Sequence, residues 1–258
     1  MGKMVTNFNR SYLQVVLVLP ILLIIPSSAL FPAHFAPYPS PMTPINLHIL
    51  AQESPAFGLP FPDPPGPNTW LLGQTYGNTT GAFRQRNNTY RAGQGIHFGI
   101  DLSARCGYPV VAIGDGVVSK VDALEHGSAP HNLMIDHPNG YASFYGHLLE
   151  TPDLAVGQAV VKGELVAYVG DPDETCTSRP HLHLEIRNAG AYNKAFNPIP
   201  LIDADWDTLA LTGSFGRGFA RDLSDPRRWQ RLDDQPDIDF WGPILNDYAD
   251  PWPLEWGQ

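Results

Sequence analysis

Three short motifs place histidine and carboxylate side chains at spacings that could hold a metal ion. They are His97-Phe-Gly-Ile-Asp101, Tyr145-Gly-His147-Leu148, and His181-Leu-His183 followed by Glu185. Imidazole and carboxylate are ligands that Zn²⁺ accepts, and a catalytic zinc site uses three such ligands while a fourth position takes water. Together the three motifs predict a catalytic zinc site.

Spacing limits how these side chains can be arranged. Residues two apart on a strand point to the same face, so we expect His181 and His183 to project from one side of a sheet into one pocket. His97 and Asp101 are four apart, and Gly99 with its β-type surroundings favours a loop running into a strand over a helix. Spacing alone does not decide which of these four residues bind the metal. Spacing also leaves the alternative of a structural zinc site, in which all four residues coordinate the metal and no position remains for water.

Short runs rich in β-branched residues, bounded by glycine and turn residues, indicate the strands that must position these motifs. The runs lie at 109–113, 116–121, 132–137, 141–147, 165–169 and 181–187. Their lengths, and turns such as Pro138-Asn139-Gly140, are typical of an antiparallel sheet or sandwich, and no βαβ alternation is visible. The sequence therefore predicts an all-β fold.

The composition bounds the size and the partners of the folded part. The chain has 258 residues, of which 16% are charged, with 24 glycines and 26 prolines. This length allows one sizeable core with appendages, and the glycine and proline content favours turns and linkers over a helical bundle. The net charge is −10 and no stretch gathers the basic residues. Neutralising phosphates needs clustered Lys and Arg, so we expect no nucleic-acid partner.

The N-terminus is predicted to be an export segment. Basic residues precede an apolar run at 12–25, and Ser27-Ser28-Ala29 supplies the small residues that a signal peptidase requires. Residues 1–29 are therefore predicted to be a signal peptide or, if uncleaved, an N-terminal anchor. In both cases the remainder of the chain is expected to be extracytoplasmic, and any membrane contact to be made through this segment alone.

Residues 30–69 are predicted to be a proline-rich linker. Eleven prolines fall between positions 32 and 67, with few charges and little periodicity. Such a stretch favours extended conformations over packed elements. Phe57, Leu59 and Phe61 leave open the alternative that this stretch is an arm packed on the domain.

Further motifs surround the histidines and together resemble a known family. They are the runs at 95–102 (Gly-Ile-His-Phe-Gly-Ile-Asp-Leu), 107–112, 114–118, 145–148, 156–163 and 180–186 (Pro-His-Leu-His-Leu-Glu-Ile). In order and spacing they resemble the lysostaphin-type, or LytM, zinc endopeptidases of peptidase family M23. The resemblance covers about residues 70–200.

The resemblance implies an antiparallel β-sheet groove, with hairpins like those of biotinyl and lipoyl domains, that binds peptidoglycan peptides. It implies one Zn²⁺ per chain held by His97, Asp101 and His183, with His147 and His181 as catalytic histidines that do not bind the metal. The implied activity is hydrolysis of peptide bonds in cross-links or stem peptides by zinc-activated water. A monomer is expected.

Some features depart from the family pattern or leave alternatives open. Where many relatives read Ser-Thr-Gly-Pro, residues 177–180 read Thr-Ser-Arg-Pro, which puts a cation beside the groove and leaves substrate preference open. Tyr145 either adds a phenolic donor beside His147 or packs in the core. The remaining histidines match no motif and are expected on the surface or in loops.

Two other functions compete with the peptidase. The first is a non-catalytic member of the same family that binds cell wall or activates an amidase. The second is a biotinyl or lipoyl carrier domain, because residues 114–118 and 156–166 resemble carrier hairpins. A carrier needs a modifiable lysine at a hairpin tip, and Lys120, Lys162 and Lys194 are not flanked by the carrier motif.

The C-terminal residues 203–258 form an acidic extension that contains five of the six tryptophans. Such apolar side chains favour a segment packed over the main domain, with a wall- or partner-binding segment as the alternative.

Cys106 and Cys176 each lie five residues from an expected site residue, and an exported compartment permits oxidation. We therefore expect them to form a disulfide, with two buried free thiols as the alternative.

Overall fold

The computed structural model describes residues 55–213, 222 and 232–247. The predicted export segment, residues 30–54 of the expected linker, and Trp229, Trp252 and Trp256 lie outside these ranges. No helix among the described residues is long and apolar enough to cross a membrane.

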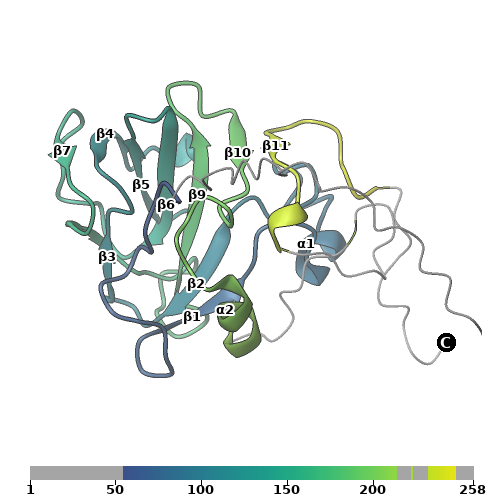
Figure 1. The fold of residues 1–258 in the computed structure, drawn as a ribbon, viewed down its shortest axis with the longest axis horizontal. Helices are drawn as coiled ribbons and strands as arrows, with labels where there is room; N and C mark the ends of the chain where they lie inside the picture. Colours follow the sequence, from purple (N-terminus) through teal and green to yellow (C-terminus); the bar gives the residue numbers. More distant parts are fainter. Residues whose placement is uncertain (1–54, 214–221, 223–231, 248–258) are drawn as a thin grey trace, which may run out of the picture. The chain divides into compact units, whose positions relative to one another are not determined.

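Antiparallel strands are the main regular secondary structure of the described part of the chain, and helices are few and short (Figure 1), as the all-β prediction requires. The strands are β1 (Trp70–Gln74), β2 (Ile100–Ala104), β3 (Pro109–Val111), β4 (Gly116–Val121), β5 (His131–Asp136), β6 (Tyr141–Leu148), β7 (Ala159–Val160), β8 (Leu165–Tyr168), β9 (His181–Asn188), β10 (Lys194–Phe196) and β11 (Ile238–Asp239). The helical elements are α1 (Thr80–Arg84), α2 (Trp206–Thr212) and the 3-10 turns Leu124–His126 and Leu232–Asp234. All six runs predicted from the sequence correspond to strands.

The main sheet has the strand order β1-β2-β9-β6-β5-β4-β7, and β10 and β11 continue it from β9. A smaller sheet pairs β3 with β8. The register of β2 against β9 sets Asp101 opposite His183 and Ser103 opposite His181. The sheet therefore brings together two motifs that lie about 80 residues apart in the sequence.

Strand β9 alternates between a core face and a polar face, because successive side chains of a strand point to opposite sides. Leu182, Leu184 and Ile186 are completely buried in the main hydrophobic cluster. Burying each such side chain contributes about 1.5–3 kcal/mol. The intervening His183 and Glu185 occupy the other face, so the core anchors the strand that carries the polar site.

The folded part begins before the expected boundary at Trp70. Phe57 is 1% exposed and forms a parallel bridge with Ile202, and Gly58 N donates to Ile113 O at 2.8 Å. Phe61 packs against Trp70 with ring centroids 5.2 Å apart. From Phe57 onward the predicted linker is thus a packed arm, because its aromatic side chains fill the core.

The described part of the C-terminal extension packs on the domain, as expected from its apolar residues. Trp206 and Leu209 of α2 are buried in the main cluster, and β11 pairs with β10. Trp241 differs from this expectation, since 71% of its surface is exposed. It occupies a turn with a backbone φ of 66° and is held there by a hydrogen bond from its N–H to Ala92 O.

The predicted disulfide is present between Cys106 and Cys176. It joins the turn before β3 to the loop that leads into β9. A crosslink between residues 70 apart removes loop-closure entropy worth roughly 4 kcal/mol from the unfolded chain in the chain-entropy model.

Candidate metal centre

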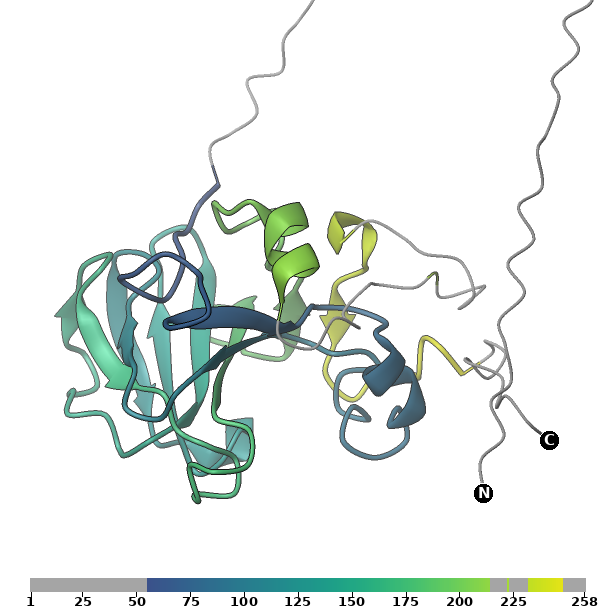
Figure 2. The same ribbon diagram turned by 90° about the horizontal axis from the view of Figure 1, so that it is seen from below.

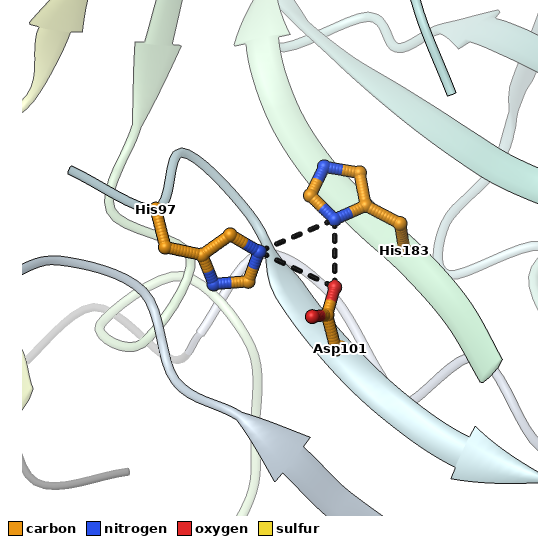
Figure 3. Close-up of side chains that lie close together, drawn as sticks. All are labelled: His97, Asp101 and His183. Carbon is orange, nitrogen blue, oxygen red and sulfur yellow. Dashed lines mark hydrogen bonds and ion pairs between the residues drawn. The ribbon is translucent and has the colours of Figure 1, made fainter. Parts of the chain in front are cut away.

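His97, Asp101 and His183 converge on one point (Figure 3). His97 Nε2 lies 3.3 Å from both Asp101 Oδ1 and His183 Nδ1, and His183 Nδ1 lies 2.8 Å from Asp101 Oδ1. A tetrahedral zinc ion with bonds of about 2.0–2.1 Å would separate its ligand atoms by about 3.3 Å. The spacing of the three atoms therefore fits a zinc ion with little rearrangement.

Different elements present the three side chains. Asp101 lies on β2 and His183 on β9, as neighbours across the sheet. His97 precedes β2 in a loop, and it exchanges two backbone hydrogen bonds with Gly77, at 2.8 and 3.0 Å. This agrees with the prediction of a loop that runs into a strand between His97 and Asp101.

The outward nitrogen of each histidine ligand has a fixed acceptor. His97 Nδ1 lies 2.8 Å from Thr75 O, and His183 Nε2 lies 3.1 Å from Glu185 Oε1. With a proton on each outward nitrogen, the two inward nitrogens present lone pairs beside the Asp101 carboxylate. Three acceptors that face one another require a cation between them. An imidazole backed by a carboxylate or carbonyl is also the usual support of a zinc ligand.

Glu185 and Arg187 form the buried support behind His183. Glu185 is completely buried, and Arg187 donates to it through Nε at 2.7 Å and Nη2 at 2.9 Å. Burial alone would raise the pKa of the Glu185 carboxyl, but Arg187 and His183 hold this pKa below its ordinary value. Glu185 is therefore an anion that orients the His183 ring. No sequence motif indicates the role of Glu185 or of Arg187, because it depends on the folded arrangement of β9.

In the metal-free protein a proton takes the place of the cation. Burial would lower the pKa of His183, but its hydrogen bonds to Asp101 and Glu185 raise this pKa to about 9. Burial would raise the pKa of Asp101, but His97 and His183 hold it well below its ordinary value. A metal ion that binds here must displace the His183 proton, as is general for imidazole ligands.

His147 and His181 lie beside the three converging residues, with ring centroids 4.9 Å apart. The Nδ1 atom of each ring faces a backbone carbonyl, Ala129 O for His147 and Arg179 O for His181. His181 Nε2 is 3.8 Å from Asp101 Oδ1, farther than the inward atoms of His97 and His183. Burial lowers the pKa of His147 to about 4, so its ring is neutral near pH 7. All five residues singled out in the sequence therefore meet in one place.

Tyr145 packs in the core and is not part of the site. It is completely buried, and its Oη accepts from Ile113 N at 3.0 Å. Of the two alternatives for Tyr145, packing in the core is therefore the one confirmed. His147 adopts a φ of 58°, which interrupts the alternation of β6, so the two residues do not share one face of the strand.

Tyr90, which belongs to none of the sequence motifs, lies edge-on to His97 with ring centroids 5.6 Å apart. Its Oη donates to Gln74 Oε1 at 3.2 Å. Burial, followed by the nearby charge of Asp101, raises the pKa of Tyr90 to about 12, so its hydroxyl keeps its proton. No sequence motif surrounds Tyr90, so only the fold reveals its position.

A third buried histidine, His137, belongs to a different cluster. It follows β5 in a loop, which agrees with the loop alternative of the expectation, but its side chain is buried, with 6% exposed, and does not lie on the surface. His137 Nδ1 lies 2.8 Å from Asp115 O, and Nε2 lies 2.8 Å from Ser143 Oγ, which in turn lies 3.1 Å from Tyr145 Oη. Each of these contacts can hold one proton between a donor and an acceptor, so the cluster needs no cation.

Comparison with known proteins places the site in a family. Residues 95–198 match the model of peptidase family M23. An uncharacterized metalloprotease of Haemophilus influenzae is 38% identical over 103 residues, which are 40% of this chain and 20% of that protein. The DD-carboxypeptidase/endopeptidase Mpg of Neisseria meningitidis serogroup B is 37% identical over 108 residues, which are 40% of this chain and 22% of that protein. The chain thus spans about a fifth of the length of these relatives.

Among solved structures, the putative glycyl-glycine endopeptidase lytM from Ruminococcus gnavus is similar at 26% identity, with a TM-score of 0.43. The similarity covers 57% of this chain and 59% of that one. The family match begins two residues before His97 and includes Asp101, His147, His181 and His183. The chain therefore contains a domain of peptidase family M23.

Proposed function

We propose that this protein is an exported zinc endopeptidase that hydrolyses peptide bonds in peptidoglycan cross-links or stem peptides. The observation that carries the proposal is the convergence of three acceptor atoms, from the buried His97 and His183 and the half-buried Asp101, beside two further histidines. A purely structural cluster would balance its donors and acceptors, as the His137 cluster does. The family match supports the substrate class, because a relative is named as an endopeptidase.

His97, Asp101 and His183 would hold the zinc ion through Nε2, Oδ1 and Nδ1. When bound, zinc supplies Lewis acidity, which polarises a carbonyl and lowers the pKa of water. Thr75 O and Glu185 fix the orientation of the two imidazole ligands by accepting their outward protons. The longer distance between His181 Nε2 and Asp101 supports His181 as a group beside the metal and not a fourth ligand.

His147 and His181 are proposed to handle protons and charge during hydrolysis. With Nδ1 of each ring held by a backbone carbonyl, the neutral ring carries its proton on Nδ1 and offers the lone pair of Nε2. Nε2 can then take a proton from water and deliver it to the departing amine. The protonated ring can also donate a hydrogen bond to the oxyanion. Removing such a group typically costs about 10²- to 10⁴-fold in rate.

An extracytoplasmic location is proposed from two observations. The Cys106–Cys176 disulfide fits an oxidising compartment, where such bonds persist. The basic and apolar start of the chain has the pattern of an export segment. Secretion with signal cleavage and retention by an uncleaved anchor both place the domain where peptidoglycan lies.

The direct test is digestion of purified sacculi by the zinc-loaded protein, with identification of the released fragments by mass spectrometry. We expect soluble peptide fragments, and a chelator should abolish their release. The bond that is cleaved would follow from the masses. If the protein binds zinc and sacculi but releases no fragment, the non-catalytic wall-binding or amidase-activating alternative replaces the peptidase.

A further inference from the structure

The C-terminal segment 235–246 lies against the loop that carries His97, although it is outside the residues that match the family. Figure 2 shows this segment, with β11, beside the segment that contains α1. We infer that residues 235–246 position the metal ligands of this chain. The inference rests on the proposed zinc site and extends it, because residues 235–246, the tail, then support the ligands of that site.

The first connection runs through residues 75–78, which hold His97. Thr75 O accepts from the His97 ring, and Gly77 pairs with the His97 backbone. The tail holds this stretch in turn, because Gln235 Oε1 accepts from Asn78 N at 2.7 Å. Gln235 is only 4% exposed, so water cannot readily replace it.

Gly77 and Tyr76 strengthen the same connection. Gly77 has a φ of 102°, and a side chain at this position would collide with the side chain of Gln235. Tyr76 is completely buried, and its Oη donates to Pro236 O at 2.8 Å. The backbone that pairs with His97 is thus shaped to fit the tail closely.

The second connection reaches the residues just before His97. Asn246, which is completely buried, donates through Nδ2 to Gly95 O at 2.7 Å and to Asn78 Oδ1 at 3.0 Å. Gln94 Oε1 accepts from Asp239 N at 2.7 Å, and its Nε2 donates to Pro243 O at 2.8 Å. The tail therefore fixes both backbone segments between which His97 is held.

The third connection reaches the other histidine ligand. Phe240 packs edge-on to Phe98, which packs edge-on to the His183 ring with centroids 5.6 Å apart. Arg187, which holds Glu185, lies between the rings of Phe144 and Phe240, at 4.3 and 4.6 Å from their centroids. The tail thus covers the support of His183 as well as that of His97.

These contacts matter for metal binding because a zinc site tolerates little displacement of its ligands. A functional constellation must be held within about 0.5 Å of its working geometry by the residues around it. Loss of outer groups that orient metal ligands typically costs about 10- to 100-fold in metal affinity. The tail supplies several such groups from outside the matched domain.

The test uses the full chain with Gln235→Met and Asn246→Leu, separately and together. Both substitutions nearly keep the side-chain size and remove the polar groups that hold Asn78 and Gly95. Zinc affinity is measured by competition with a chromogenic chelator, and ligand geometry by the absorption spectrum of the Co²⁺-substituted protein. We expect the double variant to bind zinc about 10- to 100-fold more weakly and to show an altered Co²⁺ spectrum.

Leu209→Ala is the matched control. Leu209 is buried in the main hydrophobic cluster from α2 of the same extension, and α2 lies outside residues 235–246. This variant should lower the melting temperature while zinc affinity and the Co²⁺ spectrum stay unchanged. Gln235→Glu is a second control, since it keeps an acceptor for Asn78 N and should restore affinity relative to Gln235→Met.

The outcomes separate this inference from the proposed function. If the parent protein does not bind zinc, the proposed function and this inference both fail. If the parent binds zinc and the tail variants keep its affinity and Co²⁺ spectrum while melting earlier, the tail only stabilises the fold and the inference alone is wrong. If the double variant does not fold, the two single variants decide by the same criteria.

Discussion

Two buried histidine clusters in this protein differ in how their protons are balanced. Around His137, the contacts to Asp115 O and Ser143 Oγ pair each acceptor with a donor. Around His183, the inward atoms of His97 and Asp101 add acceptors and no donor, so the cluster is complete only with a proton or a metal ion. The comparison shows that proton balance, and not burial or residue type, distinguishes a structural histidine from a candidate ligand.

The strongest way to break the comparison is to remove the anion behind His183. Glu185→Gln leaves Arg187 without its buried partner, which typically destabilises a fold by about 3–5 kcal/mol. It also weakens the acceptor for His183 Nε2, so zinc affinity should fall by about 10- to 100-fold. Chemical denaturation of the metal-free protein and zinc competition measure the two effects. Unchanged zinc affinity would show that Glu185 has only a structural role.

The stability of the metal-free protein and its affinity for zinc should change with pH in opposite directions, because both depend on the proton on His183. The pKa of His183 is raised from 6.5 to about 9 in the metal-free fold. This group therefore stabilises the metal-free protein fully below pH 6.5, and the stabilisation is lost as the pH rises through 9, by on the order of 3 kcal/mol. Zinc binding requires the deprotonated ring, so zinc affinity should rise over the same interval.

Melting temperatures between pH 6 and 9.5, with chelator and with excess zinc, test this prediction. The melting temperature of the chelated protein should fall toward high pH, and the added stabilisation by zinc should grow. Calorimetry in buffers of different ionisation enthalpy should detect a proton released on zinc binding below pH 9. If no proton is released at pH 7, His183 does not hold an extra proton in the metal-free protein, and this prediction is wrong.

The smallest effect on stability is expected from a substitution in the cluster around His137. Ser143→Ala removes the partner of His137 Nε2 and leaves that buried atom without a hydrogen bond, which typically costs about 1–3 kcal/mol. Zinc content and affinity should remain those of the parent protein. Denaturation together with zinc competition measures both quantities. A loss of zinc in this variant would show that the two clusters are coupled and would weaken the contrast between them.

The elements that the sequence predicted are those with a local signal. The β-branched runs at 116–121 and 181–187 form β4 and β9 because alternation and turn residues are encoded within a few positions. Strand β11 was missed because it is short and forms only through pairing with β10, about 40 residues away. Its residues carry no strand pattern of their own.

The residues of the site also fall into two groups, those that sequence motifs indicate and those that only the fold reveals. Motifs indicated His97, Asp101 and His183, because side chains that bind metals have recognisable types and spacings. Thr75 supports His97 through a backbone carbonyl, which any residue type could supply, so the sequence carries no signal for it. The sequence gives no signal for the role of Gln235 either, since this role depends on a contact with Asn78, which is 157 positions away.

The zinc content of five alanine variants tests the central claim most directly. Alanine at His97, Asp101 or His183 should strip the metal, because two remaining ligands hold zinc poorly. Alanine at His147 or His181 should leave about one zinc per chain, while hydrolysis of peptidoglycan falls by about 10² or more. If His181→Ala loses zinc as completely as His183→Ala, or if His147→Ala keeps full hydrolysis, a three-ligand zinc centre assisted by two histidines is the wrong account of this site.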